Sequence, residues 1–434
     1  MKDNSLLRET SVKKEIPIMN LLLTLLDRLT NITIDGKGVT LLGICPVTSN
    51  VIKASIQTAK FMDFPLMFVA TLNQIDIDGG YTGLNQRDFV KLVEKEVERQ
   101  EYNGPVIIAL DHGGPWLKDK HVIEGYSFEE AMNSTMKSID ACVKAEYDLL
   151  HIDTTVDITL EKGKKLSIDE IIKRTITLIE YAEEVRKRYD VPRISYEVGT
   201  EEVHGGMTSP KLFEEFIAKL RKNLKDKGLD EIWPCFIVGD VGTYPIPGNK
   251  LDTDKSSLLV NIARTNNLHL KGHYTDFVVN PEDYPKTGIA AANIGPELAY
   301  SEYLTLNSLA NIEEKLYLRG KLSALSEVMA ELNMSIIKSD RWKKWAPEGE
   351  EFDWERFPHD RKQWLLGTSS RYVLSSTEII DKVSKLSKNL ENHGINVYER
   401  LSKSIRDVLL RYIDAFNLKD TSFKLMSALI DISF

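Results

Sequence analysis

The chain alternates short apolar runs with amphipathic segments, and this alternation limits the folds open to it more than any other feature. Eight apolar runs have the length of strands, and a segment with helical periodicity follows most of them. This order is typical of a closed parallel (β/α)8 barrel, an α/β TIM barrel with right-handed crossovers, or of a doubly wound open sheet. The predicted strands are 39–45, 65–71, 105–116, 147–155, 193–200, 233–241, 268–276 and 289–296.

The places of the polar side chains favour the barrel over the open sheet. Clusters of polar residues directly follow the second, third, fourth, fifth and seventh runs. A barrel with its active rim at the carboxyl ends of the strands requires this arrangement. We therefore predict a TIM barrel with a helical C-terminal extension.

The sequence predicts helices at both ends of the chain. An apolar run at 16–26 is too short to span a bilayer, Asn20 and Thr24 interrupt it, and no small-residue cleavage site follows it, so we expect a helix packed on the body. Beyond Glu297 only helical patterns remain, at 304–334 and 376–432, with a tryptophan-rich segment between them. The predicted division is an N-terminal helical segment 1–36, a barrel 37–311 that carries the active site, and a helical region 312–434 packed on the barrel.

The charge and the cysteine content argue against several classes of protein. The net charge of -9 argues against a general nucleic-acid binder or a protein of anionic membranes. Three widely spaced cysteines, Cys45, Cys142 and Cys235, form no CxxC spacing and suggest neither a disulfide framework nor a cysteine zinc site. We expect a cytoplasmic protein, with no membrane or nucleic-acid partner, that forms a homo-oligomer.

The third run, PVIIALDHGGPW, stops abruptly at a carboxylate and an imidazole. Asp111 and His112 follow the buried part of the strand, and Gly113, Gly114 and Pro115 end it. On a barrel this is the rim where chemistry takes place. The functional interpretation is that His112 binds a metal and Asp111 moves a proton; the structural alternative is that the pair caps the strand with hydrogen bonds.

Further imidazoles and carboxylates fall at the same predicted rim. Besides His112, the candidate metal ligands are Glu197 in the fifth run, His204 in the loop after it, and His273 in the seventh run. Imidazole and carboxylate ligands with an open position suit a catalytic divalent metal, zinc first and manganese or cobalt as alternatives. Which of Glu197, Glu201 and Glu202 binds the metal stays open. His121 and His151 are interpreted as structural.

A metal beside carboxylates suits a polyol or ketose substrate. The ion would polarise the carbonyl and stabilise an enediolate while a carboxylate transfers a proton. Two reactions use this mechanism: aldol cleavage between C3 and C4, and epimerisation at a neighbouring carbon. We assign proton transfer to Asp111, and the orientation of ligands or substrate hydroxyls to Asp153 and Asp276.

Several other polar positions are candidates for substrate binding. The turn before the last predicted barrel helix, at Gly295, occupies the usual place for a phosphate on a barrel, although glycine turns are common. Arg371 in the C-terminal region is a candidate phosphate ligand. The further candidates at strand exits are Ser49, Asn73, Gln74 and Tyr81.

Seven segments, in order and rough spacing, resemble one known family. They are GICPVTS (43–49), ATLNQIDIDGGYTG (70–83), ALDHGGP (109–115), LHIDTT (150–155), GTEEVHGG (199–206), GHYTDF (272–277) and NIGPELA (293–299). The resemblance is to the Z subunit of class II D-tagatose-1,6-bisphosphate aldolase, the GatZ/KbaZ family. It implies a class II aldolase-like barrel acting in galactitol, tagatose or amino-sugar breakdown.

One segment departs from the family pattern. The family sequence YVIGTEVP-PGG is here Tyr196 to His204, YEVGTEEVH, so Glu197 and His204 are additional potential ligands, and Glu201 is the shared glutamate and a candidate catalytic residue. The acidic strand is also similar to that of the tagaturonate or tagatose 4-epimerases, which have a zinc-type site.

Three functions remain open at this point. The first is a metal-dependent lyase that acts on a ketose or ketose phosphate, and the second is a ketose 4-epimerase, such as a fructose/tagatose (6-phosphate) 4-epimerase. The third is the role usually given to the Z subunit, a non-catalytic partner that stabilises a separate catalytic aldolase subunit.

Overall fold

Eight parallel strands form a closed barrel, which confirms the predicted fold class. A computed structural model describes residues 5–32, 38–161, 164, 166–199, 209–345 and 354–433. Neighbouring strands pair in chain order, and β1 pairs with β8 to close the barrel. The strands are β1 Leu41–Ile44, β2 Leu66–Thr71, β3 Val106–Gly113, β4 Leu149–Ile152, β5 Ser195–Gly199, β6 Phe236–Val238, β7 His269–Gly272 and β8 Ala291–Ile294.

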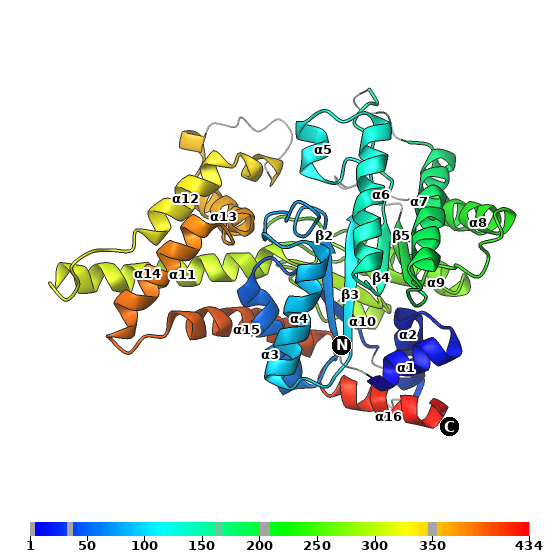
Figure 1. The fold of residues 1–434 in the computed structure, drawn as a ribbon, viewed down its shortest axis with the longest axis horizontal. Helices are drawn as coiled ribbons and strands as arrows, with labels where there is room; N and C mark the ends of the chain where they lie inside the picture. Colours follow the sequence, from blue (N-terminus) through cyan, green and yellow to red (C-terminus); the bar gives the residue numbers. More distant parts are fainter. Residues whose placement is uncertain are drawn as a thin grey trace.

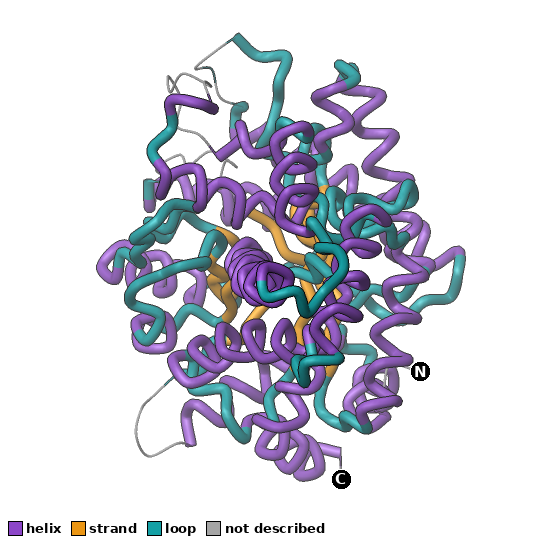
Figure 2. Tube along the Cα trace, turned by 90° about the vertical axis from the view of Figure 1, so that its left-hand side faces the viewer, coloured by secondary structure: helices purple, strands orange, loops and turns teal. Residues whose placement is uncertain are grey.

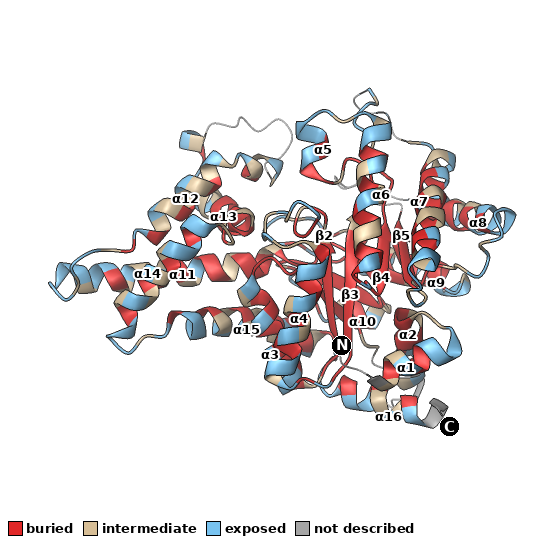
Figure 3. Cartoon of the chain, viewed as in Figure 1, coloured by how far each residue is buried: buried red, intermediate tan, exposed pale blue. Residues whose placement is uncertain are grey.

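All eight predicted runs contain a strand, but each strand is shorter than its run. The sixth has only three residues, and the eighth is confirmed over four. Nearly every strand residue is buried, as Figure 3 shows in red, because helices cover the outer face and side chains fill the inner one. Asp153 and Asp276, at the ends of their runs, lie in loops beyond the paired strands, whereas Asp111 and His112 belong to β3 itself.

Helices surround the barrel. They are α3 Ser49–Met62, α4 Gln86–Gln100, α5 Asp119–Ile123, α6 Phe128–Lys144, α7 Ile168–Arg188, α8 Pro210–Asp226, α9 Thr253–Thr265 and α10 Asp283–Thr287. A capping box of Ser127 and Glu130 starts α6. Thr48 caps α3, and its hydroxyl also donates to the buried Glu302 carboxylate.

Two N-terminal helices, α1 Ser5–Lys14 and α2 Ile18–Ile32, lie at the amino ends of the strands (Figure 1). The Arg8 guanidinium donates to the Asp148 carboxylate and to the Val106 carbonyl, which precede β4 and begin β3. The Asn20 side chain accepts a hydrogen bond from Ser195 at the start of β5. These contacts place the helices at the end of the barrel opposite the carboxyl-end loops.

A helical region follows β8 and projects from one side of the barrel (Figure 1). Its first helix, α11, crosses position 311, so the barrel and the extension share one continuous helix. In Figure 2, which looks from the side of the extension, the strands lie in the middle of the molecule with helices around them. The elements are α11 Pro296–Leu318, α12 Val328–Lys338, η1 Arg341–Trp345, η2 Trp354–Arg356, α13 His359–Ser369, η3 Ser370–Tyr372, α14 Thr377–Glu391, α15 Val397–Ala415 and α16 Thr421–Ser433.

The extension is packed on the barrel rather than separate from it. Arg411 on α15 donates to the Val278 carbonyl, and the Tyr412 hydroxyl donates to the Thr275 carbonyl, both in the barrel loop after β7. Apolar side chains of α11, α14 and α15 belong to the same buried cluster as the barrel core. Within the described residues, no helix is long and apolar enough to cross a membrane.

Candidate functional site

The end of β3 carries a bulge that turns two consecutive side chains toward one site. Leu110 pairs with Leu150 and Gly113 pairs with Ile152, so β3 has one more residue than β4 between these pairs. Successive side chains of a regular strand point to opposite faces, and a bulge removes that restriction. His112 adopts a left-handed backbone conformation with φ 49°, which is uncommon for a residue other than glycine and occurs often at functional sites.

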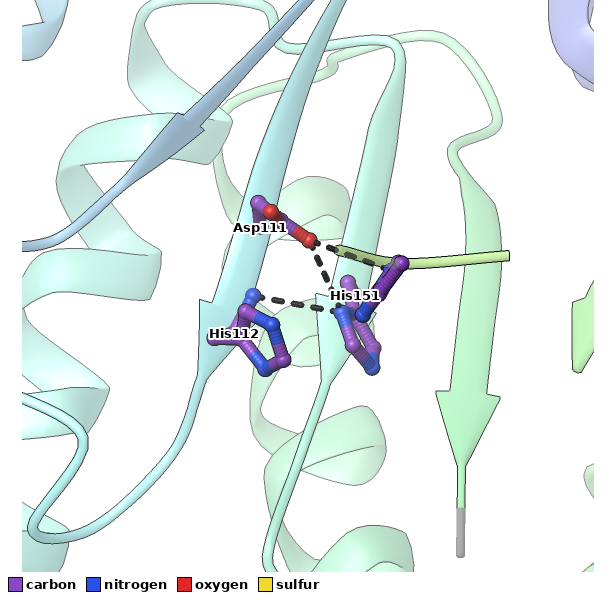
Figure 4. A group of neighbouring side chains, drawn as sticks. Asp111, His112 and His151 are labelled. Carbon is purple, nitrogen blue, oxygen red and sulfur yellow. Dashed lines mark hydrogen bonds and ion pairs between the residues drawn. The ribbon is translucent and has the colours of Figure 1, made fainter. Parts of the chain in front are cut away.

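Three imidazoles and one carboxylate meet at this bulge. His151 comes from β4 and His273 follows β7, and both are buried. The three ring centroids are 4.7 to 5.2 Å apart. One ligand atom from each of Asp111, His112, His151 and His273 lies within 4.8 Å of the others, and Figure 4 shows Asp111, His112 and His151 converging from the two strands.

Asp153 holds the His112 ring. Its carboxylate lies 2.6 Å from His112 Nδ1 and accepts hydrogen bonds from the backbone and hydroxyl of Thr155. Burial raises the pKa of Asp153, but the bond from His112 outweighs this effect and the pKa is lowered to about 2. Metal-binding histidines commonly have such a carboxylate on one ring nitrogen, and it fixes the orientation of the ring.

Glu197 is paired with a lysine inside the barrel. Lys271 Nζ lies 2.6 Å from Glu197 Oε2, and both side chains are 0% exposed. The second carboxylate oxygen lies 3.2 Å from His273 Nε2 and 3.5 Å from His151 Nδ1. Burial disfavours the charged carboxylate, yet the ammonium of Lys271 lowers the pKa of Glu197 to about 2. The lysine is the counter-charge that a carboxylate at this depth requires.

Asp111 is held from two sides. Its Oδ1 lies 3.1 Å from His151 Nδ1, and Asn293 on β8 donates to Oδ2 at 3.3 Å. Burial raises the pKa of this carboxyl, but the imidazoles of His112 and His273 lower it well below its ordinary value. Asp111 is therefore ionised at neutral pH, the state that accepts a proton.

The donor set fits a divalent cation. Burial lowers the pKa of His273 to about 4, so at neutral pH this imidazole is in the unprotonated form that binds metals. His151 Nε2 is buried and has no hydrogen-bond partner among the described residues. Imidazole nitrogens are typical ligands of zinc and cobalt and also occur in manganese sites.

Asp276 and Gly295, which follow β7 and β8, lie at the start of α11 rather than in the cluster of imidazoles. Asp276 Oδ1 accepts the backbone N–H groups of Gly295 and Glu297 at the start of α11. The Gly295 amide, predicted to bind a phosphate, is thus bound to a carboxylate in this structure. Burial raises the pKa of Asp276 to about 7.

The predicted substrate-binding residues after β1 and β2 mostly have structural partners. Both amide atoms of Asn73 bind backbone atoms, of Leu117 and Asp119, and Gln74 Oε1 accepts the Thr71 N–H. Ser49 is exposed in the first turn of α3. Tyr81 packs edge to face on Tyr372 of the extension.

Arg371 is buried, and its guanidinium lies over Trp345 and Tyr372. It lines a small cavity together with Asp276 and Pro296, at the carboxyl end of the barrel. Glu201, Glu202 and His204 lie outside the described residues, and their assignment stays a prediction.

Sequence reasoning missed three residues of the site. His151 was interpreted as structural, although it precedes Asp153 by two positions and therefore shares its face of the strand. The same spacing joins Lys271 and His273. Nothing in the sequence marked Asn293 as a site residue, because asparagine is common next to glycine turns.

Three solved structures with similar folds carry names of carbohydrate proteins. A probable tagatose 6 phosphate kinase from Sinorhizobium meliloti 1021 is 21% identical with a TM-score of 0.70, over 87% of this chain and 100% of that one. The fructuronate-tagaturonate epimerase UxaE from Cohnella laeviribosi is 10% identical with a TM-score of 0.56, over 88% and 82%. Fructose-bisphosphate aldolase from Campylobacter jejuni is 12% identical with a TM-score of 0.53, over 92% and 95%.

At these identities the likeness concerns the fold alone. The family comparison covers almost the whole chain: residues 26–430 match the family described as D-tagatose-1,6-bisphosphate aldolase subunit GatZ/KbaZ-like. With the barrel, the extension and the segments from GICPVTS to NIGPELA in agreement, the chain belongs to the GatZ/KbaZ-like family.

Proposed function

We propose that this protein is a metal-dependent enzyme that cleaves a ketose or ketose phosphate between C3 and C4 by a retro-aldol reaction. The observation that supports it best is the buried cluster of Asp111, His112, His151 and His273 at the carboxyl end of the barrel. A family member that served only as a support would not require a buried group of this chemistry at the active rim.

The charge of the described part of the site favours a bound divalent cation. Asp111, Asp153 and Glu197 are buried carboxylates, and among the described residues Lys271 is the one ammonium in contact with them. Two negative charges are left without a counter-charge when the imidazoles are neutral, and burying such charges is costly. Zinc, manganese or cobalt held by His112, His151 and His273 would balance them and, when bound, polarise the substrate carbonyl.

Asp111 is the proposed base. Cleavage of the C3–C4 bond requires removal of the C4 hydroxyl proton, and the electron pair of the broken bond stays on the C3 side, next to the carbonyl. The proton goes to the Asp111 carboxylate, which His151 and Asn293 hold in place. Asp153 keeps the His112 ring oriented.

Two other functions are supported by a particular comparison. A 4-epimerase would break the same bond and re-form it on the other face of the aldehyde, and the fold shared with the fructuronate-tagaturonate epimerase is compatible with this reaction. The family description names an aldolase subunit, which supports a role as the stabilising partner of a separate catalytic subunit.

Product analysis separates these functions. The purified protein, loaded with zinc, manganese or cobalt, is incubated with tagatose 1,6-bisphosphate, fructose 6-phosphate and free ketoses, and the products are resolved by NMR. We expect three-carbon products that disappear with a chelator and in His112→Ala. C4 epimers in their place would establish the epimerase. No turnover, together with stabilisation of an added aldolase subunit, would refute the catalytic proposal.

A further inference from the structure

A carboxylate of this chain occupies the place at which barrels often bind a phosphate. That place is a helix N-terminus beside the loops after the seventh and eighth strands, where backbone N–H groups point toward an anion. Here the helix is α11, and Asp276 Oδ1 lies 2.9 Å from the Gly295 nitrogen and 2.8 Å from the Glu297 nitrogen. Pro296, between these two residues, has no N–H group. Asp276 therefore accepts the hydrogen bonds that a phosphate would accept.

The other N–H groups of this helix turn have partners as well. The Leu298 and Ala299 nitrogens lie 3.0 and 3.4 Å from the Gly295 carbonyl oxygen, to which they donate. On the side of β1 the turn packs against Cys45, because a Cβ atom on Gly295 would lie only 2.7 Å from Cys45 Cβ. The turn 295–299 thus offers an incoming anion neither an unused N–H group nor space on the side of β1.

The loop that carries Asp276 is fixed by hydrogen bonds on both sides of this residue. Asn249 Nδ2 donates to the Asp276 carbonyl at 2.9 Å and also to the Tyr274 carbonyl. The Phe277 N–H donates to Glu297 Oε2 at 2.6 Å. The backbone on either side of Asp276 is therefore tied to its surroundings, and this geometry presents the carboxylate to the start of α11.

Charge and space at this helix start both disfavour a phosphate. Glu297 is a second carboxylate here, and Arg411 pairs with it at 2.7 Å. Burial, and to a smaller extent the charge of Glu297, raises the pKa of Asp276 to about 7, although the two N–H groups act in the opposite direction. The cavity between Asp276 and Arg371 measures about 10 Å³, which is enough for one water molecule at most. A phosphate needs more room and carries more charge than the one carboxylate that is already disfavoured.

We propose that Asp276 is a specificity-determining residue, whose carboxylate excludes phosphate from the start of α11. The exclusion concerns anion binding and does not depend on catalysis. Its consequence for the substrate rests on the proposed function: the end of the sugar that reaches the loops after β7 and β8 carries no phosphate. A free ketose, or a monophosphate with its phosphate at the other end, is then a better substrate than a ketose bisphosphate.

Selenate tests the exclusion, because it has the shape of phosphate and its anomalous signal locates it in a crystal. Crystals of the chelator-treated full chain are soaked with selenate at pH 8, above the pKa of Asp276. Asp276→Ala removes the carboxylate and releases the N–H groups of Gly295 and Glu297. The matched control is Asp252→Ala, which makes the same change in charge at the exposed cap of α9.

We expect a selenate peak within hydrogen-bonding distance of the Gly295 and Glu297 nitrogens in Asp276→Ala. Wild type and Asp252→Ala should have no peak at this place. Selenate bound there in wild type or in the control would overturn the proposal, and so would its absence in Asp276→Ala. The wild-type crystals keep the proposal open to refutation even if Asp276→Ala fails to fold.

Kinetics test the consequence for the substrate. Wild type should have a lower kcat/KM for tagatose 1,6-bisphosphate than for the better of its two monophosphates. Asp276→Asn keeps an acceptor oxygen but loses the charge, so the ratio of kcat/KM for the bisphosphate to that for the monophosphate should rise about tenfold. An unchanged ratio would contradict the role of the charge.

The two experiments separate this inference from the proposed function. The expected selenate pattern without turnover of any sugar would leave the exclusion standing and refute the enzyme. Cleavage of the bisphosphate as fast as of the monophosphates, together with selenate at the start of α11 in wild type, would refute the exclusion and leave the enzyme standing.

Discussion

Removal of the Lys271 ammonium should destabilise the metal-free protein severely. Lys271→Met leaves the Glu197 carboxylate in the barrel interior, 0% exposed and without its counter-charge. Removing one partner of a buried ion pair costs about 3–5 kcal/mol, because the remaining charge stays desolvated. At an unfolding entropy of about 2.1 cal/mol/K per residue, a chain of 434 residues loses about 1 °C in Tm for each kcal/mol. The expected decrease is therefore about 3–5 °C.

The double variant provides the internal comparison. Glu197→Gln alone should lower Tm by a similar amount, since it leaves the ammonium unpaired, whereas Glu197→Gln combined with Lys271→Met removes both charges and should recover most of the loss. Lys403→Met breaks an exposed pair with Asp407 and should change Tm by about 1 °C or less.

Differential scanning calorimetry at one scan rate measures all four variants. The loss in Lys271→Met should shrink when zinc is present, because the cation supplies positive charge beside Glu197. Additive losses in the double variant would show that the two charges do not stabilise each other, and a loss below 1 °C in Lys271→Met would refute the assignment of the ammonium as counter-charge.

Three further predictions follow from the site. Asp153→Asn should weaken metal binding about 10- to 100-fold in calorimetric titration, because the bond that orients the His112 ring is lost; an unchanged Kd would contradict this role. Asp111→Asn should retain the metal within a few-fold and lose sugar cleavage by at least about 10²-fold, measured by NMR. The folded-state pKa of Asp276 is raised to about 7, so its protonated form stabilises the fold at low pH and this contribution is lost as pH rises toward 7. Wild type should therefore lose about 2–3 kcal/mol relative to Asp276→Asn between pH 5 and 7 in urea unfolding, and parallel pH profiles would contradict it.

The barrel could be predicted from the sequence because its signals are local. A buried strand followed by a capped amphipathic helix repeats eight times, as with the Ser127 box before α6, and closure follows from the pairing of such units in order. The lengths of the strands could not be predicted, since apolar residues such as Cys235 and Val241 lie just outside β6 and are buried by packing rather than by strand pairing.

Only those parts of the site that lie together in one segment of the sequence could be predicted. Asp111 and His112 are recognisable at the end of an apolar run. Their convergence, however, depends on a bulge and on the positive φ of His112, and no pattern in the sequence predicts either. Likewise, the contact between Lys271 and Glu197 joins β7 to β5 across the barrel interior, and the one between Asn293 and Asp111 joins β8 to β3. Such partners are distant in sequence and are brought together by closure of the barrel.

Anomalous diffraction from crystals grown with zinc tests the central claim most directly. The account predicts one strong peak per chain within bonding distance, about 2.0–2.1 Å, of ring nitrogens of His112, His151 and His273. His151→Ala should lose the peak, and His204→Ala tests the ligand predicted in the loop after β5. A peak coordinated by other residues, or none at this cluster in the zinc-grown crystals, would contradict the account.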